Sequence, residues 1–197
     1  MTADHQVRAS IPRGRGPMPP GWAEAIAPDT LATRVSELAL DLTDVYHDRL
    51  PVMIGVLTGS FPFLADLVRA MEVPLEVDFL ALNRFGGTGK AEVRMTPTTP
   101  LTDRAVVVVE DIVDTGLTLT FLREYLLAAG ASSVDAVTLL DRPARRIVDV
   151  PLEFRGFSVG NDFLVGYGLD YQGMFRNLDG LWAVDPAALG PMFQTVR

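Results

Sequence analysis

The sequence of 197 residues has no cysteine, a single lysine (Lys90) and no long apolar run. Without cysteine, the chain has no disulfide framework, no thiol nucleophile and no thiolate metal site. Its densest apolar run, residues 105–109, is far shorter than the roughly 18 residues of a membrane span, so no membrane partner is expected. The 25 acidic residues exceed the 17 basic ones, which argues against a nucleic-acid partner held by bulk positive charge.

Two sequence signals are also missing. The N-terminus lacks the apolar core of a secretory signal, and together with the missing cysteine this favours a cytoplasmic protein. The Gly-Lys-Ser/Thr pattern of P-loop nucleotide hydrolases does not occur. Sixteen of the 17 basic residues are arginine, so an arginine at one position is weak evidence that a guanidinium is required there.

The first 21 residues differ in composition from the rest of the chain. They mix arginines with prolines and glycines and offer little apolar surface to bury, so residues 1–21 are predicted to be a disordered basic tail. Residues 22–197 are predicted to form one domain, because about 150–200 residues suit a single core.

Helical and strand patterns alternate along this domain. Apolar residues spaced by three and four predict a helix from Pro28 to about Leu50. The other predicted elements are strands at 52–57, 75–82, 105–109 and 134–140, helices at 61–71 and 117–129, and a polar loop at 83–92. This alternation predicts an α/β fold, a parallel sheet with helices on both faces. Short extended pieces after Arg146, at 154–159, 163–169 and 181–184, are interpreted as an appendage over the carboxyl edge of the sheet.

The most informative segment is the run from Val106 to Leu119, in which a buried strand is followed by Glu110, Asp111 and a tight turn into a helix. Ligands of open α/β sheets bind beyond the carboxyl ends of the strands. The turn at 114–118 is expected to aim backbone N–H groups at one point, where the helix dipole adds positive potential. Such a turn binds phosphate without lysine or arginine, and Gly116 permits close backbone approach.

Two acids beside a phosphate site need an explanation of their own. They suit a ligand that carries vicinal hydroxyls or Mg²⁺ next to its phosphate, as a phosphorylated ribose does. The plainer interpretation is that Glu110 and Asp111 only end a strand and that Asp114 is a turn residue. An aspartic protease is a third alternative, because residues 112–116 match its apolar-apolar-Asp-Thr-Gly pattern. That enzyme needs two such aspartates facing each other in a β-rich fold, whereas the pattern occurs once here and precedes a helix.

Residues 107–118 resemble the phosphoribosyl-pyrophosphate (PRPP) motif of the type I phosphoribosyltransferases. Four further segments narrow the resemblance to the hypoxanthine-guanine phosphoribosyltransferase family, in the same order along the chain: 55–60, 73–79, 92–94 and 163–171. The resemblance covers roughly residues 30–184. It implies a parallel twisted sheet flanked by helices, with a core at about 50–150 and a small hood formed by residues 22–49 and 151–197.

The resemblance also implies an activity. Members of the family use Mg²⁺ to transfer the 5-phosphoribosyl group of PRPP to N9 of a 6-oxopurine. For this chain the expected acceptor is hypoxanthine, with guanine or xanthine as further candidates. The products are the nucleoside 5′-monophosphate and pyrophosphate. Family members assemble as homodimers or homotetramers, so a homo-oligomer is expected for this chain.

Residue roles follow from the same resemblance. Asp114 is the candidate general base beside purine N7. Glu110 and Asp111 hold the ribose hydroxyls and the first Mg²⁺, and Asp170 helps to bind a second one. The other implied contacts are with the 5′-phosphate (Asp114, Thr115, Gly116, Leu117 and Thr118), with pyrophosphate (Thr58, Gly59 and Arg176) and with the purine (Arg142, Phe163 and Leu164).

This chain departs from the family pattern in three places. Thr58 replaces a lysine that follows a cis peptide in the family, which predicts a weaker pyrophosphate site or compensation by an arginine. Arg142 replaces the lysine that donates to the purine 6-oxo group, and this swap is not neutral because the guanidinium is a larger, planar donor. In the mobile loop, Arg84 and Phe85 replace Ser-Tyr, and Arg84 could supply the missing cation.

These departures leave two alternatives open. The first is a phosphoribosyltransferase with altered base specificity, and the second is a non-catalytic regulator that senses PRPP or nucleotide on the same fold. Asp114, Asp170 and Arg176 favour the enzyme, whereas the missing lysine at position 58 favours the regulator. Arg145 and Arg146 are expected on the solvated surface, outside the site.

Overall fold

The computed structural model describes residues 18–19, 21–83 and 92–187. The chain divides into two compact units, one of residues 32–160 and one that combines residues 1–31 with residues 161–197. The candidates Arg84 and Phe85, and most of the predicted tail, lie outside the described residues.

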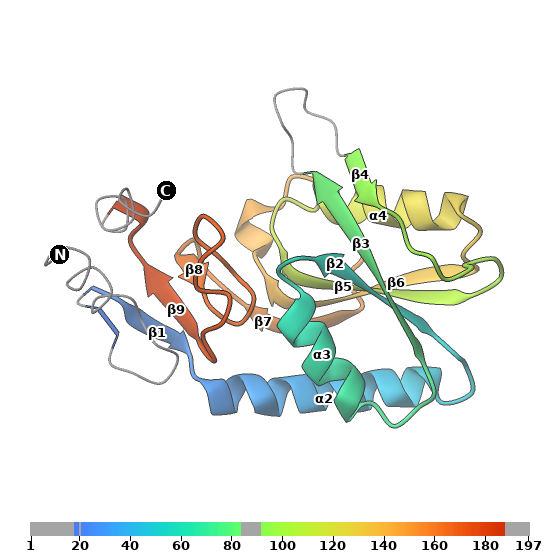
Figure 1. The fold of residues 1–197 in the computed structure, drawn as a ribbon, viewed down its shortest axis with the longest axis horizontal. Coiled ribbons are helices and arrows are strands. Elements are labelled where there is room, and N and C mark those ends of the chain that lie inside the picture. Colours follow the sequence, from blue (N-terminus) through green and yellow to red (C-terminus); the bar gives the residue numbers. More distant parts are fainter. Residues whose placement is uncertain (1–17, 20, 84–91, 188–197) are drawn as a thin grey trace, which may run out of the picture. The chain divides into compact units, whose positions relative to one another are not determined.

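A six-stranded sheet forms the centre of the larger unit, within its described residues (Figure 1). Its strands, in spatial order, are β4 (Glu92–Met95), β3 (Glu76–Asn83), β2 (Val52–Leu57), β5 (Ala105–Val113), β6 (Ser133–Asp141) and β7 (Phe154–Ser158). Every neighbouring pair is parallel except β3 and β4, which run antiparallel. The predicted α/β architecture with a mainly parallel sheet is therefore confirmed.

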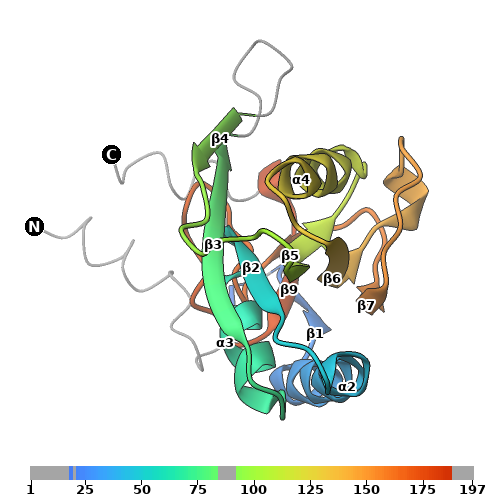
Figure 2. The ribbon, with the colours of Figure 1, turned by 90° about the vertical axis from the view of Figure 1, so that its right-hand side faces the viewer.

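Helices cover both faces of this sheet. Figure 2 shows α4 (Leu117–Ala128) on one face, and α3 (Phe61–Ala70) and α2 (Pro28–Tyr46) on the other. Leu119, Leu122 and Leu126 of α4 are spaced by three and four residues and are buried against a core that includes Val106 and Val108 of β5. Each such leucine contributes about 1.5–3 kcal/mol of burial free energy. The valines of β5 are buried on both faces, as the continuous apolar run predicted.

The structure corrects the sequence interpretation at three elements. β5 continues to Val113, so Glu110 and Asp111 lie inside the strand rather than beyond it. Residues 154–158 belong to the main sheet as β7, parallel to β6, and are not part of an appendage. This strand was misassigned because no long helix precedes it, only the single 3₁₀ turn η1 (Pro143–Arg145). The predicted loop at 83–92 gives way at Glu92 to β4, a short antiparallel edge strand.

The smaller unit is built on a three-stranded antiparallel sheet in the order β1 (Ala23–Ile26), β9 (Leu181–Val184) and β8 (Phe163–Val165). Trp22 packs edge-on against Phe175, with 5.1 Å between the ring centroids. Gly166 has a φ of +102°, and a Cβ built there would lie 2.1 Å from the Gly180 carbonyl oxygen, so no larger residue fits.

This unit is narrower than the hood of residues 22–49 and 151–197 that the resemblance implies. β7 belongs to the larger unit because it pairs with β6. Most of α2 also belongs to the larger unit, because this helix packs against that unit and forms hydrogen bonds with it. Tyr46 of α2, for example, is fully buried and donates to the Asp135 carboxylate at 2.5 Å. That residues 22–197 act as one domain stays a prediction.

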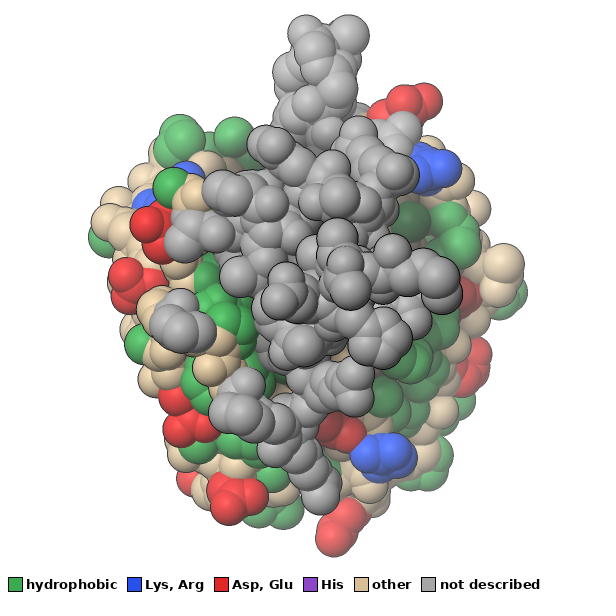
Figure 3. Space-filling model, turned by 60° about the vertical axis from the view of Figure 1, so that its left-hand side comes forward, with side chains coloured by type: hydrophobic (Ala, Val, Ile, Leu, Met, Phe, Trp, Pro, Cys, Tyr) green, Lys and Arg blue, Asp and Glu red, His purple; other side chains and the backbone are tan. Residues whose placement is uncertain are grey.

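The surface agrees with the acidic composition. On the face drawn in Figure 3, acidic side chains are scattered over the described surface, and the few basic ones lie apart from one another. None of the helices in the described ranges has both the length and the apolar character needed to cross a membrane.

Asp78 in β3 joins its strand to the segment that follows β4, and it makes stability depend on pH. Burial raises the pKa of its carboxyl, but the N–H groups of Thr99, Phe79 and Thr98, each 2.7 Å away, outweigh burial and lower the pKa below its ordinary 3.8. A depressed pKa stabilises the fold above the unfolded-state pKa of about 4, and this contribution is lost as pH falls through both values.

We therefore expect Asp78→Asn to be less stable than the wild type near neutral pH, with a gap that narrows below about pH 4. Urea unfolding at stepped pH measures this gap. A gap of constant size across the series would contradict the assignment.

Candidate functional site

The carboxyl ends of β2, β5 and β6 lie together at one edge of the parallel sheet. Each of these strands is followed directly by a predicted site residue: Thr58 after β2, Asp114 after β5 and Arg142 after β6. Val113 is registered opposite Asp141, and the Arg142 N–H donates to the Val113 carbonyl at 3.0 Å. The structure therefore brings together three candidates that are up to 84 positions apart in the sequence (142 − 58).

The two adjacent acids of β5 are both buried, Glu110 to 4% and Asp111 to 5% residual exposure. One oxygen of Asp111, Oδ1, accepts a hydrogen bond from the Ile112 N–H at 3.0 Å. The other, Oδ2, lies against the backbone of Gly59, where a Cβ would be only 1.8 Å away. This contact joins the acid pair to the turn after β2, in which the Leu57–Thr58 peptide is cis.

The turn between β5 and α4 has the form expected of an anion site. Gly116 is the N-cap of α4 with a φ of +87°, a conformation that glycine adopts at little cost. The Thr115 carbonyl accepts hydrogen bonds from the N–H groups of Ile147 and Val148 at 2.9 and 3.1 Å. The first N–H groups of a helix have no partner within the helix, and the dipole favours an anion there. Asp114, Thr115, Gly116, Leu117 and Thr118 can thus surround one phosphate.

Two arginines that were expected on the surface, Arg145 and Arg146, contact this turn. Arg145 Nε lies 3.1 Å from Asp114 Oδ1, and Arg146 Nη1 donates to the Asp114 carbonyl at 3.0 Å. Arg146 also pairs with the buried carboxylate of Asp141, whose other oxygen lies 3.0 Å from Arg155 Nε. The expectation of a solvated role is wrong for Arg146, whose side chain is 17% exposed. No local signal predicted this contact, because the burial of Asp141 becomes apparent only in the folded sheet.

Four other predicted residues lie in the smaller unit. Phe163 of β8 is 37% exposed and meets Tyr171 edge-on, whereas Leu164 is buried. Asp170 and Arg176 form an ion pair of 2.7 Å. The second oxygen of Asp170 accepts from the Gly173 N–H at 2.6 Å, and Arg176 also donates to the Gly168 carbonyl at 2.6 Å. The roles predicted for these residues stay predictions.

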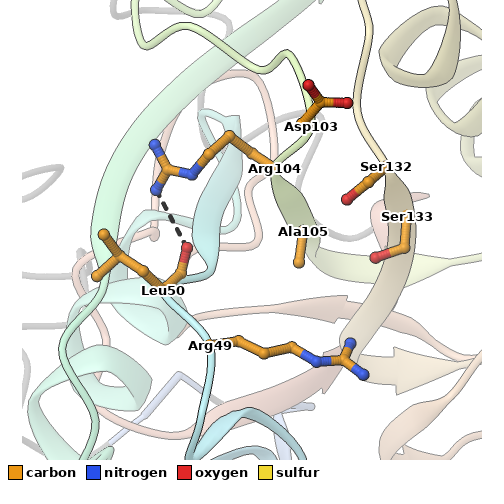
Figure 4. A pocket seen from close by; sticks show the side chains of 7 residues that line it. All are labelled: Arg49, Leu50, Asp103, Arg104, Ala105, Ser132 and Ser133. Atoms are coloured by element: carbon orange, nitrogen blue, oxygen red, sulfur yellow. Dashed lines mark hydrogen bonds between the residues drawn. The ribbon is translucent and has the colours of Figure 1, made fainter.

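A hollow of about 280 Å³ lies at the opposite edge of the larger sheet, where β5 and β6 begin (Figure 4). Its lining residues are Arg49, Leu50, Asp103, Arg104, Ala105, Ser132 and Ser133. The Arg104 guanidinium is turned toward Leu50 and donates to its carbonyl at 3.1 Å, and it also pairs with Glu76 at 2.9 Å. These bonds assign Arg104 a structural role, and the hollow is remote from the acid pair.

Metal-binding capacity at the site is partial. Within the described residues, no group of three or more histidines, aspartates and glutamates is placed to hold a metal ion. Mg²⁺ rarely uses an all-protein cage and is typically held by one or two carboxylates with waters and substrate phosphate oxygens. Glu110 and Asp111 therefore fit Mg²⁺ that arrives with a phosphorylated substrate.

Comparisons with known proteins agree with this geometry. A model of the phosphoribosyl transferase domain matches residues 25–172. A hypoxanthine-guanine phosphoribosyltransferase of Bacillus subtilis is 39% identical over 166 residues, covering 82% of this chain and 92% of that protein.

Solved structures give the same result. A hypoxanthine-guanine phosphoribosyltransferase from Bacillus anthracis superposes with a TM-score of 0.80 at 36% identity, covering 83% of this chain and 98% of that one. A Trypanosoma cruzi hypoxanthine phosphoribosyl transferase superposes with a TM-score of 0.81 at 30% identity, covering 86% of this chain and 94% of the other.

Proposed function

The chain belongs to the hypoxanthine-guanine phosphoribosyltransferase family, and from this membership we propose that it transfers the 5-phosphoribosyl group of PRPP to N9 of a 6-oxopurine. The products are the nucleoside 5′-monophosphate and pyrophosphate, which makes the chain a purine-salvage transferase. The observation that carries the proposal is the glycine-capped turn 114–118, which directly follows a parallel strand with two buried acids near its carboxyl end.

The reaction breaks the bond between ribose C1′ and the pyrophosphate oxygen and forms the bond from C1′ to N9. The N–H groups of the turn hold the 5′-phosphate, and Glu110 and Asp111 hold the ribose hydroxyls, so the sugar is fixed while positive charge develops at its ring. Fixed groups of this kind stabilise a charged transition state because they need no reorganisation during the reaction. Asp114 accepts the proton that the purine loses.

We propose Mg²⁺ as the metal of the reaction. Glu110 and Asp111 would share it with oxygens of PRPP, and Asp170 would contribute to a second ion. When bound, Mg²⁺ neutralises negative charge on the leaving pyrophosphate. At Asp170 a metal would share the carboxylate with Arg176, which lies 2.7 Å away.

The residues proposed for the pyrophosphate and purine subsites also follow from family membership. Thr58, Gly59 and Arg176 would contact pyrophosphate, with one cation fewer than in the family because Thr58 replaces lysine. Arg142, Phe163 and Leu164 would contact the base. The Arg142 backbone is tied to Val113, and its guanidinium would donate to the 6-oxo group while Phe163 stacks on the ring.

We expect turnover of PRPP with hypoxanthine, guanine or xanthine to exceed turnover with adenine by about 10²-fold or more. The reason is that the 6-amino group of adenine is a donor and would face the donor nitrogens of Arg142. A panel of purine bases with PRPP and Mg²⁺, read as pyrophosphate release and nucleotide formation, measures this preference. Tight PRPP binding without turnover of any base would overturn the proposal and favour a PRPP-sensing regulator.

Assembly and location belong to the same proposal. A homodimer or homotetramer is supported by family membership, and in the Trypanosoma cruzi relative the C-terminal region has a role in the oligomeric state and the enzymatic activity. Size-exclusion chromatography with light scattering tests it. The cytoplasmic location rests on the cysteine-free composition.

A further inference from the structure

The segment that follows η1 lies along the outer side of the phosphate turn. The N–H groups of Ile147 and Val148 both donate to the Thr115 carbonyl, at 2.9 and 3.1 Å. The Val148 carbonyl lies 2.5 Å from the position that a Cβ on Gly116 would take. Residues 146–148 therefore pack directly on the backbone of the turn.

Arg146 contacts the preceding peptide unit of the turn, the one that contains the Asp114 carbonyl. Its Nη1 donates to the Asp114 carbonyl at 3.0 Å, while its Nη2 pairs with the Asp141 carboxylate at the end of β6. The side chains are well shielded, with 17% exposure for Arg146 and 2% for Asp141. A planar guanidinium can make both contacts at once from fixed positions, which an ammonium group does less well.

Two successive carbonyls of the turn, those of Asp114 and Thr115, are thus held by residues 146–148. A trans peptide unit is planar, and its N–H points away from its C=O. Holding the Asp114 carbonyl therefore directs the Thr115 N–H to the other side, and holding the Thr115 carbonyl does the same for the Gly116 N–H. Successive backbone N–H groups aimed at one point form an anion-binding nest.

We propose that Arg146 is a positioning residue for the 5′-phosphate, because it fixes the peptide plane that aims the Thr115 N–H at the ligand. This inference rests on the proposed function, since it concerns the same phosphate turn. Arg146 does not touch the phosphate itself. It connects Asp141 at the end of β6 with the turn after β5, so the turn is held in place relative to β6.

Arg155 offers a matched control. Its Nε lies 3.0 Å from the second oxygen of Asp141, so it pairs with the same buried carboxylate as Arg146. Among the described residues, its side chain makes no polar contact with the turn. Arg146→Gln and Arg155→Gln therefore each remove one cationic partner of Asp141, and only the first releases the Asp114 carbonyl.

The test compares the binding of inosine 5′-monophosphate, inosine and ribose 5-phosphate to the two variants and the wild type by calorimetry. We expect Arg146→Gln to weaken the binding of the two phosphorylated ligands by about tenfold or more, because binding must then order the released turn at a cost similar to that of the lost bond from a charged donor. The affinity for inosine, which has no phosphate, should stay within about twofold. Arg155→Gln should leave all three affinities within about twofold. In steady state, the KM for PRPP should rise with Arg146→Gln while the KM for the base stays unchanged.

If both variants weaken the binding of the phosphorylated ligands equally, or if neither weakens it, the inference is overturned and Arg146 is only a structural partner of Asp141. If Arg146→Gln does not fold, Arg146→Lys keeps the charge beside Asp141 and loses the second hydrogen bond. Tenfold weaker phosphate binding by a folded Arg146→Lys supports positioning, and wild-type binding overturns it. A wild-type protein that binds ribose 5-phosphate but turns over no purine would refute the proposed function alone.

Discussion

Replacing Asp114 with asparagine is expected to lower kcat by about 10²–10⁴-fold, the usual contribution of a general base. Asparagine keeps the shape of the side chain and cannot accept the purine proton. The phosphate turn uses backbone N–H groups rather than the Asp114 carboxylate, so binding of a nucleoside 5′-monophosphate should stay within a few-fold of the wild type. The KM for PRPP should change little for the same reason.

Asp149→Asn is a suitable control for this prediction. Asp149 is an exposed carboxylate a few residues beyond Arg145, and its loss changes net charge near the site by the same amount. Pre-steady-state measurement of nucleotide formation separates chemistry from product release. A kcat for Asp114→Asn within tenfold of the wild type would remove Asp114 from the role of base.

Replacing Gly59 with alanine is expected to lower kcat/KM for PRPP by about 10²-fold or more, because misplaced reacting groups cost that much. The added methyl would lie 1.8 Å from Asp111 Oδ2 and 2.6 Å from its Cγ, inside the van der Waals contact distance of both atoms. Asp111 is buried and already bonded to the Ile112 N–H. Either the carboxylate or the turn after β2 must move, and both belong to the proposed site. Overpacking of this kind also costs about 1–3 kcal/mol of stability.

Two further variants test whether the contact with Asp111 causes the losses expected for Gly59→Ala. Gly160→Ala is the matched control, because a Cβ there meets nothing within 4 Å, and it should leave activity unchanged. The double variant Gly59→Ala/Asp111→Ala removes the obstructing carboxylate, so its unfolding free energy should recover while its activity stays low. If the double variant is as unstable as Gly59→Ala alone, the contact with Asp111 is not the reason for the loss.

The periodic patterns of the chain predicted its larger elements because their causes are local. The valine run of β5 must be buried on both faces, and the leucine spacing of α4 gives that helix one apolar face. The extended segment at 154–159 was predicted, but its place in the main sheet was not, because a parallel strand without a preceding helix has no local pattern that separates it from an antiparallel piece. Its place depends on the open edge of β6, which exists only once the sheet has assembled.

In the candidate site, too, local patterns predicted some features and not others. The turn from β5 into α4 was predicted, since a buried strand, a glycine and a helix start follow one another in the sequence, and its binding of phosphate stays a prediction. The surroundings of Arg146 were not predicted, because the composition is rich in arginine and nothing near position 146 reveals a buried partner at Asp141. The pairing of Asp170 with Arg176 was also hidden, although each residue had been singled out separately.

The sequence by itself determined the α/β class, the family and the turn 114–118, because backbone hydrogen bonding and apolar periodicity act over a few neighbouring residues. Only the tertiary structure decided that Asp111 packs against Gly59 and that Arg146 joins Asp141 to the Asp114 carbonyl. The contact of Arg146 with Asp114 spans 32 positions (146 − 114), and that of Asp111 with Gly59 spans 52 (111 − 59). They exist because the parallel sheet carries the ends of β2, β5 and β6 to one edge, an arrangement that no short stretch of sequence specifies.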